Sequence, residues 1–122
     1  MQPVLDLRYF QLPLPEATRS LHELSAYEQA ELENSVSARH RAGWLSARWM
    51  IKRLLRERLD DRAKRRFDPS LISVLSRDVG GQPTRPKIID VDRPLNLQVS
   101  ISHTRRGVLV GLSRRHDLML GV

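Results

Sequence analysis

The segment from Ser37 to Leu59 constrains the fold most, because its apolar residues recur at helical spacing. The apolar stripe consists of Trp44, Ala47, Ile51, Leu54, Leu55 and Leu59. This pattern predicts one long helix whose apolar face packs on a hydrophobic core. Arg41, Arg48 and Lys52 share a different face of the same helix, and we expect that basic face to be solvated.

The residues before this helix predict one strand and two shorter helices. Apolar and polar residues nearly alternate over 4–10, which is typical of a strand. A short helix is predicted over 15–24, with proline in its first turn. Ser25 and Glu28 have the spacing of a capping box, so a second helix is predicted over 26–34.

The period of the apolar pattern changes after the long helix. The charge-dense stretch 60–69 is predicted to be a surface loop, and 79–83 is predicted to be a turn. Alternating or β-rich runs then predict strands over 71–75, 87–89, 97–102 and 108–113, the last two as a hairpin. Helices followed by strands indicate an α+β fold, in which the long helix packs on an antiparallel sheet.

Composition limits the classes of partner. The 122 residues are 40% hydrophobic and contain no cysteine, which suits a folded cytoplasmic protein without disulfides. No apolar run approaches the roughly 20 residues that a membrane span needs, so we expect no membrane partner. The formal net charge is +7, and 18 of the 21 basic residues are arginine. This charge favours an anionic partner, because the guanidinium group suits bidentate contacts with phosphate.

The block Val99-Ser100-Ile101-Ser102-His103-Thr104 carries the most specific functional signal. A strand that ends in Ser-His places a hydroxyl and an imidazole at the rim of a sheet. The dipeptide alone is a weak signal, because no acidic residue has triad spacing and the four histidines lack metal-ligand spacing. Its neighbours strengthen it: Gly81-Gln82-Pro83 precedes it and Gly121-Val122 follows it.

The order of these motifs after Ala47-Arg48-Trp49-Met50-Ile51-Lys52-Arg53-Leu54-Leu55 resembles the first half of the Sfp-type 4'-phosphopantetheinyl transferases. Their pattern runs Gly-Arg-x-x-x-Arg-x-Leu-Leu, then Gly-Lys-Pro, Ser-[Ile/Leu]-Ser-His and Gly-Val-Asp-x-Glu. The resemblance covers about residues 20–122 and implies one lobe of that fold. It also implies transfer of phosphopantetheine from coenzyme A to a serine of an acidic apo carrier protein.

The resemblance implies a set of coenzyme A-binding residues. These are Arg39, Arg77, Gly81, Gln82, Pro83, Ser102 and His103. Arg39 matches a basic residue that reaches the 3'-phosphate, and Arg77 matches one at the adenosine end. Ser102 and His103 match the pair that contacts the phosphates.

Two positions depart from the family pattern. Gly81 and Pro83 match the turn beside the adenine and ribose, but Gln82 stands where the family has lysine or arginine. A neutral donor there removes the charge-assisted part of one contact, about 1 kcal/mol. Arg105 replaces the glycine that is common two residues after the histidine.

The resemblance places the catalytic metal outside this chain. In the family, Mg²⁺ is held by the Asp and Glu of Gly-Val-Asp-x-Glu and by a later Glu, whereas this sequence ends at Gly121-Val122. We therefore expect residues 1–122 to be the N-terminal, coenzyme-binding lobe, inactive without its second half. The short trimeric holo-acyl-carrier-protein synthases fit less well, because Lys52 is followed by Arg53 instead of their glutamate and Asp6 has no preceding Gly-x.

Two hypotheses from other classes stay open. A nucleic-acid-binding module would use the Arg41, Arg48 and Lys52 face and the basic run 62–66, although the few aromatic residues offer no stacking platform. A degenerate lobe would act only through protein interaction. An isolated lobe is also expected to self-associate through the apolar surface that its second half would cover.

Overall fold

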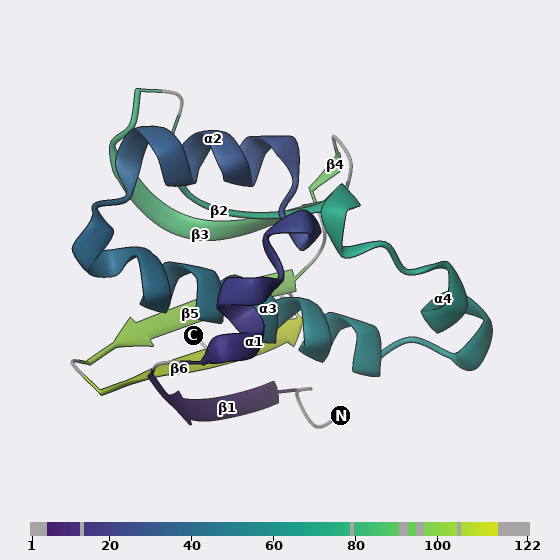
Figure 1. Cartoon of the computed structure of the whole chain (residues 1–122). Helices are drawn as coiled ribbons and strands as arrows, with labels where there is room; N and C mark the ends of the chain where they lie inside the picture. The colour runs from purple at the N-terminus through teal and green to yellow at the C-terminus, as the bar shows by residue number, and fades with distance from the viewer. Residues whose placement is uncertain are drawn as a thin grey trace.

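A computed structural model describes residues 5–12, 14–78, 80–90, 93–94, 97–104 and 106–114 (Figure 1). The helices are α1 (Pro15–Arg19), α2 (Ala26–Ser35), α3 (Arg41–Glu57) and α4 (Asp61–Arg66). Single 3-10 turns are η1 (Leu21–Glu23), η2 (Ala38–His40) and η3 (Pro69–Leu71). The strands are β1 (Leu5–Gln11), β2 (Ile72–Arg77), β3 (Pro83–Asp90), β4 (Arg93–Pro94), β5 (Leu97–His103) and β6 (Gly107–Arg114). The α+β class, with a long helix against antiparallel strands, is as predicted.

The strands form two antiparallel sheets where we expected one. Their orders are β1–β6–β5 and β2–β3–β4. The hairpin β5–β6 is confirmed, with pairing from Leu97↔Arg114 to His103↔Val108. The first strand, β1, pairs along its whole length with β6 near the other end of the chain. This pairing joins segments about a hundred residues apart, so no local pattern predicts it.

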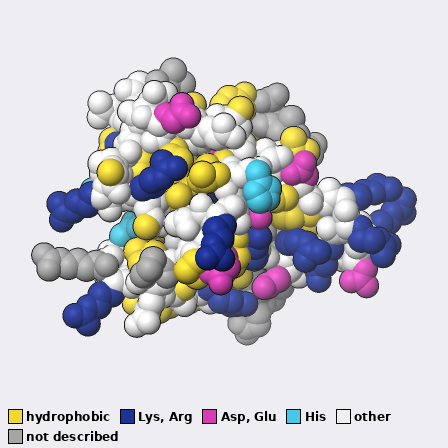
Figure 2. All heavy atoms as spheres, viewed as in Figure 1, with side chains coloured by type: hydrophobic (Ala, Val, Ile, Leu, Met, Phe, Trp, Pro, Cys, Tyr) yellow, Lys and Arg dark blue, Asp and Glu magenta, His cyan; other side chains and the backbone are white. Residues whose placement is uncertain are grey.

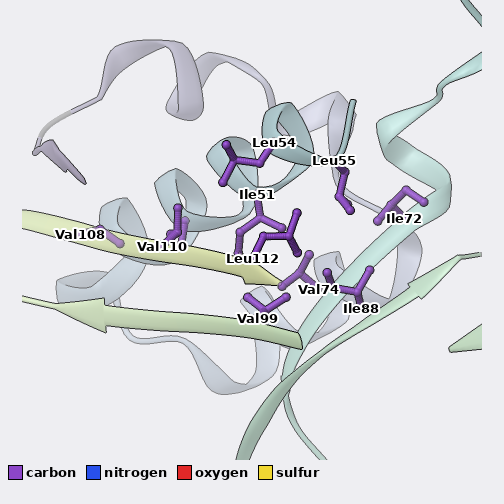
Figure 3. Packing of buried hydrophobic residues seen from close by; sticks show 11 residues of the cluster. Ile51, Leu54, Leu55, Ile72, Val74, Ile88, Val99, Val108, Val110 and Leu112 are labelled. Carbon is purple, nitrogen blue, oxygen red and sulfur yellow. The ribbon is translucent and has the colours of Figure 1, made fainter. Parts of the chain in front are cut away.

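The core joins α3 to both sheets. Ile51 and Leu54 are almost fully buried, together with apolar residues of β2, β3, β5 and β6 (Figure 3). The buried cluster consists of Ala47, Ile51, Leu54, Leu55, Ile72, Val74, Ile88, Val99, Val108, Val110 and Leu112. The apolar stripe predicted on α3 is confirmed over its first five members, whereas Leu59 lies beyond the helix and is half-buried. The strands contribute alternate residues because successive side chains point to opposite faces of a sheet.

The capping box predicted at the start of α2 is confirmed. The Ser25 hydroxyl accepts a hydrogen bond from the Glu28 amide at 3.1 Å, and the Glu28 carboxylate accepts one from the Ser25 amide at 2.9 Å. The helix predicted over 15–24 is shorter than expected, because α1 ends at Arg19 and only a 3-10 turn follows. Among the described helices, none combines the length and apolar character that a membrane crossing needs.

The prediction of a surface loop over 60–69 is wrong, because this stretch contains α4. The Asp60 side chain accepts a hydrogen bond from the Ala63 amide at 2.8 Å, which caps the start of the helix. Alanine, lysine and arginine then have high helix propensity. The high charge of this stretch favours the prediction of a loop, although Asp60 is an N-cap residue like Ser25.

Candidate functional site

The predicted coenzyme-binding residues lie on three segments of the chain. Arg39 is in η2, the turn from Arg77 to Pro83 joins β2 to β3, and Ser102 with His103 ends β5. All three segments lie at the same end of the molecule, at the left of Figure 1, whereas α4 lies at the opposite end. The start of α3 also lies at this end, which we call the η2 end.

The turn between β2 and β3 is held by its own hydrogen bonds. The Asp78 carboxylate accepts a hydrogen bond from the Gln82 amide at 2.9 Å, and the Asp78 amide donates to the Gln82 carbonyl at 2.9 Å. Gly81 has φ of +82°, a conformation that favours glycine. The Arg77 guanidinium donates to the Gly81 carbonyl at 3.3 Å, so this arginine folds back over the turn. The Gln82 residue itself is exposed.

Ser102 and His103 lie on opposite faces of the β1–β6–β5 sheet. His103 is on the helix side, where a Cβ atom placed on Gly43 of α3 would lie 3.1 Å from its Nδ1 atom. Ser102 pairs with Leu109, which is 40% exposed on the face away from α3. A ligand that contacts both side chains must therefore reach around the end of β5. Glycine at position 43 leaves the room that the imidazole occupies.

The imidazole of His103 has a positive environment. Partial burial lowers the pKa of His103 below the ordinary value of 6.5, and the charges of Arg48 and His40 lower it further. The Nδ1 atom of His40 is hydrogen-bonded to the Ser37 hydroxyl at 2.8 Å. A neutral imidazole still carries one N–H group, so it offers a donor to an anion at neutral pH.

We expect an NMR titration of the ring protons to give His103 a midpoint below 6.5, and His40→Gln to raise that midpoint. Because the folded-state pKa lies below the unfolded value, protonation favours the unfolded chain. The contribution of His103 to stability is therefore present above pH 6.5 and is lost as the pH falls through the folded-state pKa. A midpoint at or above 6.5 in the wild type would contradict the described environment.

The basic face predicted on α3 is not solvated. Arg41 is exposed, but Arg48 and Lys52 each retain only 1% exposure. Arg48 pairs with Glu31 at 3.1 Å and Lys52 pairs with Glu28 at 2.5 Å. Burial lowers the pKa of Arg48 to about 10 and also lowers that of Lys52. The prediction failed because helical spacing shows that residues share a face, but it does not show what covers that face.

This burial weakens the nucleic-acid hypothesis. Two of the three cations on the proposed face are unavailable to a phosphate backbone, because each is paired with a buried carboxylate. The run 62–66 remains at the surface, where Lys and Arg side chains gather at the end of the molecule that carries α4 (Figure 2). That cluster alone is an ordinary charged helix, with its last-turn cations favourably placed for the helix dipole.

The carboxylates of α2 cover the free edge of β2. Glu28 accepts a hydrogen bond from the Val74 amide at 2.9 Å, and Glu31 accepts from the Ser76 amide at 3.0 Å. At the same edge, Arg48 Nε donates a hydrogen bond to the Val74 carbonyl at 3.0 Å. Polar groups at an exposed strand edge invite wrong pairing, and here side chains satisfy them.

This network was not predicted from the sequence, although the spacing of its charged residues is a signal for it. Glu28 and Glu31 are three residues apart on α2, and Arg48 and Lys52 are four apart on α3. Such spacings place each pair on one side of its helix. Two matched pairs of opposite charge on neighbouring helices indicate that the helices face one another.

In the part of the chain that the structure describes, neither a metal site nor a surface hollow adds further ligand-binding residues to the η2 end. Among the described residues, no group of three histidine or acidic side chains could hold a metal ion. An open hollow of about 360 Å³ lies beside α4, and none of the predicted site residues lines it. Its lining mixes Arg62 and Arg66 with Asp60, Asp68 and Asp90, so neither sign of charge dominates.

Comparison of the chain with protein-family models and with curated proteins found no match. The motif order that ends in Ser102-His103 therefore stands as a resemblance. The structure adds the arrangement of Arg39, the β2–β3 turn and the end of β5 at the η2 end. This arrangement offers guanidinium and imidazole groups to an anionic ligand.

Proposed function

We propose that this chain is a coenzyme A-binding lobe of a 4'-phosphopantetheinyl transferase. The observation that carries the proposal is that all the residues matched to coenzyme contacts lie on three segments at the same end of the molecule, the η2 end. Coenzyme A bears a 3'-phosphate and a diphosphate at different places along its length. Cations on separate segments of the chain can therefore each contact one of these groups. Arg39 would contact the 3'-phosphate and Arg77 the adenosine end.

Electrostatics at the η2 end support an anionic ligand. No side chain caps the start of α3, where the helix dipole is positive. Arg39 is exposed and makes no ion pair with any described residue, so its charge is available. His103 lies against Gly43 in the first turn of the same helix.

The remaining partners follow from the resemblance. Mg²⁺ would offset charge on the diphosphate of the bound coenzyme. The acceptor would be an acidic apo carrier protein, steered by the net charge of +7. Leu7, Tyr9 and Leu109 are exposed on the face of the β1–β6–β5 sheet away from α3, and self-association through this face stays a prediction.

The test is coenzyme A binding by calorimetry and thermal melting, with and without Mg²⁺. We expect Arg39→Gln to weaken binding of coenzyme A about tenfold, because a charge-assisted contact is lost. The same substitution should leave binding of dephospho-coenzyme A, which lacks the 3'-phosphate, unchanged. Arg65→Gln is the matched control, because Arg65 is also exposed but lies on α4.

Three outcomes would count against the proposal. No thermal protection by coenzyme A under either metal condition would remove its basis. Equal losses for Arg39→Gln and Arg65→Gln would indicate general charge attraction without a site. Tight, steeply salt-dependent binding of duplex DNA or RNA that competes with coenzyme A would favour the nucleic-acid alternative.

A further inference from the structure

We propose that Glu31 is a positioning residue that sets the direction of Arg77 and of the β2–β3 turn, and that Arg48 and Trp44 hold Glu31 in place. This inference rests on the proposed function only in naming coenzyme A as the ligand. Glu31 retains 7% exposure, and both of its carboxylate oxygens are used. Oε1 bonds the backbone of β2, whereas Oε2 accepts from two side chains of α3 and from the Ser76 hydroxyl at 3.1 Å.

The strand-facing oxygen accepts two consecutive backbone hydrogen bonds. Oε1 of Glu31 accepts from the Ser76 amide at 3.0 Å and from the Arg77 amide at 2.8 Å. Consecutive amides of a regular strand point in opposite directions, so both can reach one oxygen only where the strand departs from regularity. Glu31 therefore stabilises a local twist at the end of β2.

The pairing of β2 with β3 shifts at the same place. Leu75 pairs with Lys87, and a regular ladder would continue with Arg77 opposite Arg85. Instead, Arg77 pairs with Pro83. Because the Arg77 amide is bonded to Glu31, it is turned from β3 towards α2. This register shift shortens the turn and brings the Arg77 guanidinium to the Gly81 carbonyl at 3.3 Å.

The other oxygen of Glu31 connects the turn to α3. Oε2 accepts from Trp44 Nε1 at 2.9 Å and from Arg48 Nη2 at 3.1 Å, and the Arg48 guanidinium stacks 4.1 Å from the Trp44 ring centre. Gly43, beside Trp44, contacts His103. One stretch of α3 thus bonds Glu31 beside the β2–β3 turn and lies next to the imidazole at the end of β5.

The chain contains a matched control for this role. Glu28 and Lys52 form a second buried ion pair between α2 and α3, and Glu28 also accepts from a β2 amide, that of Val74. Val74 stays in regular pairing with Ile88. The double variants Glu31→Gln/Arg48→Met and Glu28→Gln/Lys52→Met remove equivalent charges, but only the first touches the register shift.

The experiment compares both double variants with the wild type by amide NMR and by coenzyme A titration, corrected for the folded fraction. We expect Glu31→Gln/Arg48→Met to shift the Arg77 and Gly81 amide signals, to speed their hydrogen exchange and to weaken binding about tenfold. The control pair should leave those signals in place and binding within about twofold. Trp44→Phe keeps both charges and should shift the same signals by less.

The two readouts separate this inference from the proposed function. If the wild type does not bind coenzyme A, the proposed function fails, but the amide signals still test the role of Glu31. Unchanged Arg77 and Gly81 signals in both Glu31→Gln/Arg48→Met and Trp44→Phe would overturn the inference. Equal losses of affinity in the two double variants would overturn it as well.

Discussion

Replacing Lys52 with methionine is expected to lower the free energy of unfolding by about 3–5 kcal/mol, because the change leaves the Glu28 carboxylate buried without its counter-ion. The Lys52 ammonium donates to Glu28 at 2.5 Å and to the backbone carbonyls of Glu23 and Pro69 at 2.7 and 2.8 Å. All of these acceptors would lose their donor together. Urea unfolding followed by circular dichroism measures the loss.

Two further variants show whether the effect comes from the unpaired charge. Glu28→Gln/Lys52→Met removes both charges and is expected to recover part of the stability lost in the single variant. Arg66→Met removes an exposed cation of α4 and is expected to change stability by less than about 0.5 kcal/mol. A Lys52→Met variant as stable as Arg66→Met would show that the buried pair makes no net contribution.

Replacing Ile51 with alanine is expected to lower the free energy of unfolding by about 2–5 kcal/mol, because it opens a cavity in the centre of the core. Ile51 is fully buried on α3, facing residues of β2, β5 and β6 (Figure 3). The core joins both sheets to this helix, so the surroundings can collapse only partly. The same urea titration measures the change.

Graded substitutions give the control. Ile51→Val removes one methylene and is expected to cost about 0.5–1.5 kcal/mol. Leu71→Ala removes a larger group from a residue that is 52% exposed, so we expect a smaller effect than that of Ile51→Ala. Equal losses for Ile51→Ala and Leu71→Ala would contradict the packing described for α3.

Most local structure could be predicted from periodicity and caps. The apolar stripe identified α3, the Ser25 and Glu28 spacing identified the start of α2, and alternation identified the β5–β6 hairpin. The same logic failed for α4, where charge hid a helix capped by Asp60. These features depend on neighbours within a few residues, which is why sequence patterns report them.

Sequence motifs nominated seven residues for the candidate site, but they did not give its arrangement. Ser102 and His103 were expected to act as a pair, and the alternation of strand side chains places them on opposite faces. His40 and Gly43 entered the site only when the fold brought the start of α3 to the end of β5. Neither residue has a distinctive sequence context.

The sequence alone determined the α+β class, the long helix and the residues that resemble a coenzyme A site. Only the tertiary structure decided whether the basic face of α3 is exposed or buried. Helical spacing places Arg48 and Lys52 together, but the buried partners Glu28 and Glu31 lie 17 or more residues earlier in the chain. A charged side chain is buried only where folding supplies a counter-charge and hydrogen-bond partners. Those come from distant segments, so the same spacing of cations could form an exposed binding surface or, as here, a set of buried ion pairs.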